Sequence, residues 1–202
     1  MNAIVFVFKP RNIQIFGSYY KLSHIYFDIS HQSNLKVYLG NGANLKNVKF
    51  VVRGKECNVK LGANVKIKNS LIWLEDNACN LYIGDSTTIE SANFYITEAN
   101  SKIIVGNACM FSHDIEFRTG DSHSILDYRT MDRLNPAASI FLGNRVWIAA
   151  HVKILKGVVT EDDIIIGLGS IVTSGAKLEK NSIYAGVPAQ KIRSGIFWSR
   201  KR

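Results

Sequence analysis

The segment Leu39-Gly40-Asn41-Gly42-Ala43-Asn44-Leu45 decides the fold, because altered copies of it return every 22 residues. The copies occupy residues 61–67, 83–89 and 105–111, and each opens on an aliphatic residue followed by glycine. Three positions after the glycines stand Ala43, Val65, Thr87 and Cys109, all small side chains. Two further pairs, Leu142-Gly143 and Ile166-Gly167, extend the pattern. A period of this length predicts a repeat architecture rather than an ordinary globular fold.

A second period of six residues runs inside each copy. Its positions are Leu39, Leu45 and Val51; Leu61, Ile67 and Trp73; Ile83, Ile89 and Tyr95; and Val105, Phe111 and Phe117. Six residues fit neither a helix nor an isolated strand, but they fit one side of a solenoid coil. Three sides close a triangular coil with these side chains pointing to its axis, and four extra residues after the third position widen one corner. We expect each glycine to take a corner conformation that a side chain disfavours.

The composition fits one domain, since the chain has 202 residues and is 47% hydrophobic. A formal net charge of +9 favours an anionic partner, which leaves nucleic acid, a membrane surface and a phosphorylated cofactor open. Nucleic acid is disfavoured because the lysines are dispersed and no recognition motif is present.

The ends of the chain are predicted to be small caps. Residues 1–36 are rich in aromatic side chains and predict a strand-rich cap without the repeat, with membrane contact as the minor alternative. The solenoid is predicted to span residues 37–189 and to end near Pro188, which forbids further regular pairing. Residues 190–202 are basic and predict a C-terminal cap, with a short helix as one form.

Cysteine usage and the first residues bear on location. Cys57, Cys79 and Cys109 are an odd number of cysteines, which predicts small, buried free thiols in a reducing compartment. The apolar run 3–8 is too short to span a membrane and has no basic leader. We therefore expect neither a signal peptide nor a transmembrane helix, and a cytoplasmic protein.

The repeat is interrupted once, between Gly106 and Gly143. Their spacing is 37 residues, about 15 more than the repeat allows. The segment 126–138 is polar and contains proline, so it cannot continue the coil. We expect a projecting loop at about 120–139, and functional residues concentrate on loops held by rigid scaffolds.

His123 lies at the start of this loop, in Thr-Gly-Asp-Ser-His-Ser-Ile. Its functional interpretation is a general base that takes a proton from an acceptor hydroxyl or amine. Asp121 or Glu116 would orient its ring. The alternative is a surface histidine in a turn.

The motifs together resemble a known family. They are the histidine in Asp-x-His-Ser-Ile, then Gly-Asn-x-Val-Trp-Ile, Val-x-Ile-Leu-x-Gly-Val and Ala-Gly-Val-Pro-Ala. This set is similar to the hexapeptide-repeat, left-handed parallel β-helix O-acetyltransferases that use acetyl-CoA, which include the maltose, galactoside and bacterial polysaccharide or sialic acid enzymes. The resemblance implies an all-β solenoid, His123 as catalytic base, and a homotrimer with its active sites between subunits.

The same resemblance assigns further residues to the acyl donor. Trp147 matches a tryptophan beside the donor tunnel, and family positions that contact coenzyme A fall on Ala150, Leu168, Thr173, Ser174, Gln190 and Arg193. Four positions depart from the family's pattern: Ala149 replaces a common glycine, Leu168 a smaller residue, Ser174 a frequent lysine and Gln190 a frequent basic residue. Lys191 and Arg193 remain available for the cofactor's phosphates.

Other polar residues near the interruption are weaker candidates. His113 and His151 flank the acceptor site in one interpretation and are ordinary surface histidines in the other, and Asn93 is a candidate acceptor contact on the preceding coil. No metal is expected, because no histidine pair has the five-residue spacing of the solenoid carbonic anhydrases.

The resemblance therefore implies transfer of acetyl from acetyl-CoA to a sugar hydroxyl, which we expect to belong to a bacterial surface polysaccharide or its precursor, without an acyl-enzyme. N-acetylation of an amino sugar or nucleotide sugar is one alternative. A solenoid that serves only for binding or assembly is the other.

Overall fold

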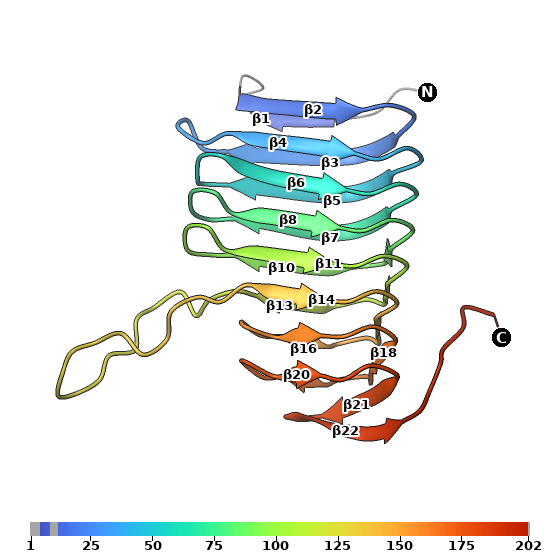
Figure 1. The fold of residues 1–202 in the computed structure, drawn as a ribbon. Helices are drawn as coiled ribbons and strands as arrows, with labels where there is room; N and C mark the ends of the chain where they lie inside the picture. The colour runs from blue at the N-terminus through green and yellow to red at the C-terminus, as the bar shows by residue number, and fades with distance from the viewer. Residues whose placement is uncertain (1–4, 9–11, 202) are drawn as a thin grey trace.

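A computed structural model describes residues 5–8 and 12–201, with side chains from residue 12 onward. All secondary-structure elements in these residues are strands, and they wind into a stack of triangular coils (Figure 1). The all-β parallel solenoid predicted from the repeat is confirmed, and so is the left-handed β-helix that the family resemblance implies. No helix in the described residues is long and apolar enough to cross a bilayer.

The first face of the prism, called face 1, is a parallel sheet of eight strands. Its members are β2 (Ile13–Gly17), β4 (Leu35–Leu39), β6 (Cys57–Leu61), β8 (Asn80–Ile83), β11 (Lys102–Val105), β14 (Ile140–Leu142), β17 (Val159–Thr160) and β20 (Lys177–Leu178). Each strand pairs with the equivalent strand of the next coil, so side chains repeat in columns along the solenoid.

The other two faces are joined in a second sheet. Three long strands bend from one face to the other: β3 (Lys21–Ile29), β5 (Asn44–Val52) and β7 (Lys66–Leu74). Face 2 continues with β9 (Thr88–Ile89), β12 (Met110–Phe111), β15 (Trp147–Ile148), β18 (Ile164–Ile166) and β21 (Ser182–Gly186). Face 3 continues with β10 (Ala92–Ile96), β13 (Ile115–Arg118), β16 (Lys153–Ile154) and β19 (Ile171–Val172).

The N-terminal residues continue the coils. The first strand, β1 (Val5–Phe8), pairs with β3, and β2 pairs with β4 at the 22-residue offset, for example Ile13 with Leu35. The segment is strand-rich as expected, but its described part is paired in the same parallel sheets as the repeat. The repeat was missed there because these first coils lack the aliphatic–glycine pair that marks the later ones.

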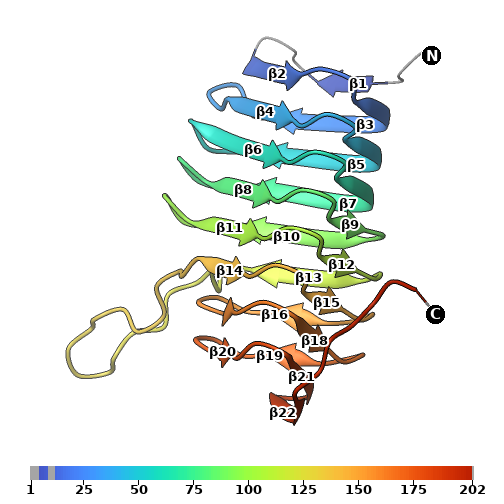
Figure 2. The ribbon, with the colours of Figure 1, turned by 45° about the vertical axis from the view of Figure 1, so that its right-hand side comes forward.

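The C-terminal cap is a strand and not the short helix that was one expectation. After the turn at Val187-Pro188, strand β22 (Ala189–Ser194) runs antiparallel to β21 and ends the parallel stack. Residues 195–201 then run back toward the middle coils along face 2 (Figure 2).

Aromatic and aliphatic side chains fill the axis. Phe94 stacks on Phe117 with ring centroids 4.9 Å apart, and both are fully buried. Trp73 and Tyr95, which the six-residue count places on the axis, instead point outward on face 3, while Ile72 and Phe94 point inward. In these coils the inward positions of faces 2 and 3 are five residues apart (Ile67 to Ile72), whereas Phe111 and Phe117 are six apart.

Three edges join the faces, and we name them by their contents. The glycine edge, between faces 1 and 2, carries the repeated glycines; the histidine edge, between faces 2 and 3, carries His113 and His151. The loop edge, between faces 3 and 1, carries the four-residue expansions and also the inserted loop (Figure 1). The loop therefore enlarges a corner that is already wide in the preceding coils.

The glycines are required for a reason other than the expected one. The aliphatic–glycine glycines have no positive φ, but a Cβ on Gly40 would lie 2.4 Å from the backbone carbon of Gly62, and one on Gly106 would lie 2.4 Å from the carbonyl oxygen of Gly143. The left-handed conformation belongs to the residue two positions later, such as Ala108 with φ of 55°. The glycines permit the coils to approach each other closely.

We predict that Gly106→Ala lowers the free energy of unfolding, whereas Ala108→Gly does not. The first substitution forces a Cβ against the next coil, and crowding of this kind costs roughly 1–3 kcal/mol. The second removes a side chain from a left-handed position and should leave stability unchanged or raise it. Urea unfolding of the intact protein measures both, and equal losses in the two variants would contradict this account of the glycine edge.

Candidate active site

The inserted loop is an ordered hairpin. A bridge between Leu126 and Arg133 pairs its two arms, and the Asp127 carboxylate accepts hydrogen bonds from the backbone N–H groups of Arg129 and Thr130 at its tip. The loop projects from the prism at the level of β13 and β14 (Figure 1). The sequence placed its boundaries within a few residues, since β13 ends at Arg118 and β14 begins at Ile140.

Asn135 holds the base of the loop together. Its Nδ2 donates to the carbonyl oxygen of His123 (2.8 Å) and to the carboxylate of Asp121 (2.9 Å), and its Oδ1 accepts from the N–H of Ile125 (2.6 Å). The residue is 7% exposed. Sequence reasoning missed it, because a single asparagine before proline carries no spacing signal.

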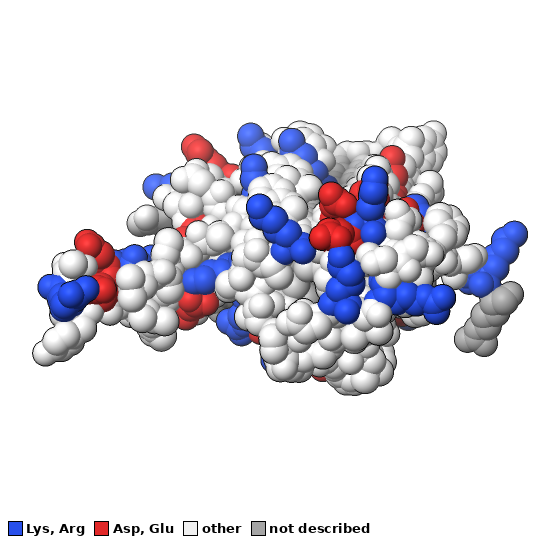
Figure 3. Space-filling view, turned by 60° about the horizontal axis from the view of Figure 1, so that its bottom comes forward, with Lys and Arg blue, Asp and Glu red and all other residues white. Residues whose placement is uncertain are grey.

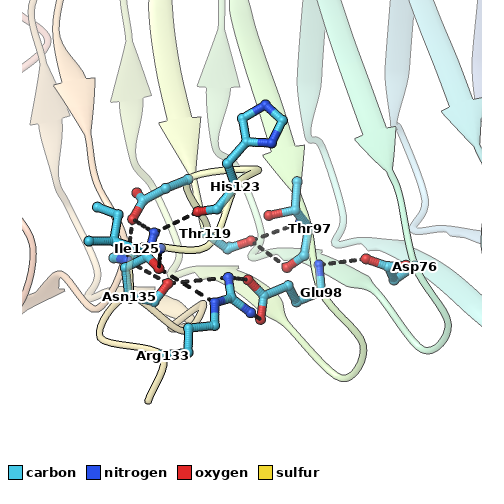
Figure 4. A network of polar contacts seen from close by, with 10 residues as sticks. Asp76, Thr97, Glu98, Thr119, His123, Ile125, Arg133 and Asn135 are labelled. Carbon is cyan, nitrogen blue, oxygen red and sulfur yellow. Dashed lines mark hydrogen bonds and ion pairs between the residues drawn. The ribbon is translucent and has the colours of Figure 1, made fainter. Parts of the chain in front are cut away.

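Two ion pairs tie this base to the solenoid, and Figure 4 shows the one between Arg133 and Glu98. Arg133 donates hydrogen bonds from Nη1 and Nη2 to the Glu98 carboxylate, and these contacts lower the pKa of Glu98. Lys156 donates to Asp121 at 2.5 Å, and this contact, ahead of the Asn135 amide, lowers the pKa of Asp121. Both carboxylates are charged at neutral pH, so the loop is held by charge-assisted hydrogen bonds.

His123 is exposed, and its ring points away from this network (Figure 4). Its backbone is fixed on both sides, since its N–H donates to the Asp121 carbonyl (2.8 Å) and its carbonyl accepts from Asn135. Within the described residues no hydrogen bond occupies its imidazole. The arrangement presents an available ring nitrogen on a restrained backbone, which is what a general base requires.

Neither of the expected orienting acids contacts that ring within one chain. Asp121 is engaged by Lys156 and Asn135, while Glu116 pairs with Arg118 and lies 3.8 Å from the Lys153 ammonium. The orienting role of Asp121 or Glu116 stays a prediction. The single chain instead shows Asp121 anchoring the loop.

Trp147 lies on the opposite side of the prism. It is on β15 in face 2, and face 2 is opposite the loop edge in a triangular section (Figures 1 and 2). Its ring contacts Trp198 of the C-terminal segment at a centroid distance of 5.9 Å. Trp198 is held by reciprocal hydrogen bonds with Arg145, at 2.6 and 2.7 Å.

The other residues expected to contact the acyl donor lie on two different sides of the prism. Ala150 and the exposed Leu168 lie on the histidine edge, next to face 2. They are neighbours across successive coils, since the N–H of Gly169, the residue after Leu168, donates to the Ala150 carbonyl (2.9 Å). Lys191 and Arg193 are on β22, and Lys191 pairs with Glu179. Thr173 and Ser174, by contrast, lie on the loop edge beside Lys156. One chain does not gather these residues at one point.

The remaining candidates lie between these groups. His113 and His151 are in edge contact at 5.1 Å on the histidine edge, and His151 Nδ1 bonds the Asp114 carboxylate at 2.7 Å. Asn93 is an outward residue of β10 on face 3, aligned with Glu116. None of the three contacts His123 within the described residues.

The cysteines are free and buried, as predicted. Burial raises the pKa of the Cys109 thiol to about 11, which keeps it protonated at neutral pH. Cys109 is fully buried as well, so it is a poor candidate for a nucleophile.

The coil geometry and the interrupted edge define a hexapeptide-repeat, left-handed parallel β-helix protein with one exposed histidine on an inserted loop. The crystal structure of the polysialic acid O-acetyltransferase OatWY matches it with a TM-score of 0.80 and 27% identity, over 94% of this chain and 92% of that chain. No family model matches the chain.

Two curated relatives match shorter segments. The polysialic acid O-acetyltransferase of Escherichia coli O1:K1 / APEC is 31% identical over 98 residues, which are 48% of this chain and 31% of that protein. The galactoside O-acetyltransferase of Escherichia coli (strain K12) is 48% identical over 54 residues, which are 27% of this chain and 26% of that protein. The matches thus span about a third of one relative and a quarter of the other. The resemblance inferred from the sequence motifs is confirmed.

The charge of the molecule does not form one patch at its C-terminal end. Seen from that end, Lys and Arg side chains are spread over the prism and the projecting loop, with Asp and Glu between them (Figure 3).

We predict that Glu98→Gln makes the loop more susceptible to trypsin. Loss of the charged partner frees Arg133, the base of the hairpin opens more often, and cleavage after Arg129 or Arg133 becomes faster. Glu90→Gln is the matched control, because it removes a carboxylate that pairs with Lys68 on face 2. Equal cleavage rates in the two variants would show that the pair with Arg133 does not restrain the loop.

Proposed function

We propose that this protein is an acetyl-CoA-dependent O-acetyltransferase that modifies a sugar hydroxyl of a bacterial surface polysaccharide or its precursor in the cytoplasm. The observation that carries the proposal is the available imidazole of His123 on a backbone fixed by Asn135. The relatives named as polysialic acid and galactoside O-acetyltransferases support the reaction class.

The proposed reaction is direct transfer, because the chain offers an exposed base, His123, while its three thiols are buried. His123 takes the proton of the acceptor hydroxyl while the hydroxyl oxygen attacks the thioester carbonyl of acetyl-CoA. A carbon–oxygen bond forms, and a backbone N–H near the donor stabilises the oxyanion. The carbon–sulfur bond then breaks, and the departing thiolate receives the proton from the imidazolium. Direct transfer agrees with the protonated, buried state of Cys109.

The placement of the candidate residues supports a site between copies of the chain. His123, Thr173 and Ser174 belong to the loop edge, whereas Trp147, Leu168 and Arg193 belong to the other side of the prism. An acyl donor can contact both groups of residues only where the loop edge of one copy packs against face 2 of another. Such heterologous contacts close into a ring, and we propose the homotrimer.

The donor's phosphates would be held at the C-terminal end of face 2. Arg193 on β22 offers a guanidinium there, and Lys191 adds a second cation whose pKa is raised by its bond to Glu179. A phosphate would compete with Glu179 for Lys191.

His123→Ala should lower acetyl transfer by roughly 10²–10⁴-fold, because the hydroxyl loses its proton acceptor. The assay is release of coenzyme A with polysialic acid as acceptor. His31→Ala, an exposed histidine on the N-terminal coils, is the control and should keep full activity. Near-normal turnover of the His123→Ala protein would refute the proposed role.

Mixing two inactive variants tests the shared site. His123→Ala and Trp147→Ala are each expected to be inactive alone, but co-assembled chains form interfaces with an intact histidine from one copy and an intact tryptophan from the next. Random mixing of equal amounts restores about a quarter of the sites. Co-expression of two differently tagged chains measures this, and a mixture as inactive as its components would contradict a site between copies.

A further inference from the structure

Face 1 carries a second set of polar and aromatic side chains that the proposed reaction does not use. Its outward column reads Phe16, Tyr38, Lys60, Tyr82, Ile104, Phe141, Val159 and Lys177, one residue from each successive coil. Coils are spaced by one strand separation, so Phe16 to Phe141 spans roughly 24 Å.

The aromatic and cationic groups of this column contact one another. Phe16 stacks on Tyr38 at a centroid distance of 4.9 Å. The Lys60 ammonium lies between two rings, 5.3 Å from Tyr38 and 5.4 Å from Tyr82. Rings that flank an ammonium hold it at the surface in a fixed position.

A parallel column next to it supplies hydrogen-bonding groups. Gln14, Lys36, Asn58, Asn80 and Lys102 align from β2 to β11. Asn58 donates to the Asn80 side-chain oxygen at 2.9 Å, and the Lys102 ammonium lies 5.6 Å from the Phe141 ring. Asn58 Nδ2 also donates to the Glu56 carbonyl, and Asn80 Nδ2 donates to the Ala78 carbonyl, so both amides are held in fixed orientations. No hydrogen bond in the described residues occupies the Asn58 Oδ1, which can accept one from a hydroxyl group.

The surface is hollowed along these two columns. Three shallow depressions follow one another, beside Asn12 and Lys36, beside Asn34 and Asn58, and beside Asn80 and Lys102. The first two share Asn34 and Lys36, and the third includes Tyr82, so amides and lysines line these depressions, with the aromatic column beside them. We call the two columns and these depressions the track.

The charge of the track has one sign. Its outward strand positions include Lys36, Lys60, Lys102 and Lys177, and none of the outward positions of the eight described strands carries a carboxylate. Glu56, at the rim of the middle depression, is its one acidic neighbour among the lining residues. A bound chain with regularly spaced negative charges matches this surface.

We propose that face 1 binds an anionic polysaccharide chain along the solenoid, apart from the site of acyl transfer. Tyrosine and phenylalanine rings pack against the apolar faces of sugar rings, amides bond their hydroxyls, and the lysines pair with carboxylates. Base stacking on nucleic acid would use similar rings, but extended arrays of amides favour a hydroxyl-rich ligand.

The track leads to the loop edge. Strand β14 of face 1 begins there, directly after the loop, and the Ser139 hydroxyl, at the exit of the loop, accepts a hydrogen bond from the backbone N–H of Lys102 (3.0 Å). A polymer held on face 1 is therefore presented beside the loop that carries His123. This link to acetylation rests on the proposed function, whereas the binding itself does not.

The test is binding of polysialic acid by the full chain. The Tyr82→Ala and the Lys60→Ala/Lys102→Ala proteins should bind it roughly tenfold more weakly or worse, whereas Lys153→Ala, an exposed lysine on face 3, should bind normally. Calorimetry with neutral dextran and with oligo-dT gives the specificity. Unchanged affinity in the face 1 variants, or equal binding of oligo-dT, would overturn the proposal.

Two further measurements separate this proposal from the enzymatic one. The His123→Ala protein should bind the polymer normally, and the face 1 variants should acetylate a sialic acid monomer at the normal rate while their KM for the polymer rises. Absence of polymer binding by the unmodified protein refutes the track alone, since acetylation of the monomer tests the reaction. Light scattering must show an unchanged mass for the variants, because dissociation would mean that face 1 joins copies of the chain and the proposal is wrong.

Discussion

The close approach of successive coils is the constraint on which the structure depends. Equivalent positions bond from coil to coil, as in Gly40 N–H to Leu61 O, Gly62 N–H to Ile83 O and Gly84 N–H to Val105 O, each at 2.8 Å. At Gly40, Gly62, Gly84 and Gly106 an added Cβ would lie under 3 Å from the neighbouring coil, so the coils are in close contact there. They cannot separate or slide without losing these bonds. Everything outside the axis is therefore repeated in columns, and extra residues fit only at a corner.

This constraint explains why the candidate active site lies on an edge of the prism. The loop edge is already expanded in the first coils, and the hairpin of residues 120–139 enlarges it without disturbing β13 or β14. The Arg133–Glu98 and Asp121–Lys156 ion pairs then fasten the hairpin to the solenoid, and Asn135 fixes the backbone of His123. The exposed imidazole of His123 is therefore attached to a restrained backbone. On the opposite side of the prism, the Trp147 ring packs against Trp198.

The repeat predicted the solenoid and the interruption because both are recorded in spacing. The prediction from the repeat was wrong where the spacing changes. Trp73 and Tyr95 point outward because the histidine edge of their coils is one residue shorter. The N-terminal coils were not predicted because they lack the aliphatic–glycine pair. The motifs predicted roles for His123 and Trp147, and these stay predictions. They gave no signal for Asn135 or for the docking of Trp198, which depend on contacts between residues 12 and 53 positions apart. Such contacts leave no local signal in one sequence.

The most direct measurement of the central claim is chemical cross-linking of a His123→Cys/Trp147→Cys protein. The native thiols are buried, so a short bis-maleimide reaches only the introduced cysteines. Because these two positions lie on opposite sides of one prism, the account predicts covalent links between copies, seen as oligomers on a denaturing gel. A product linked only within single chains, or no link at all in the presence of acetyl-CoA, would contradict an active site built from two copies.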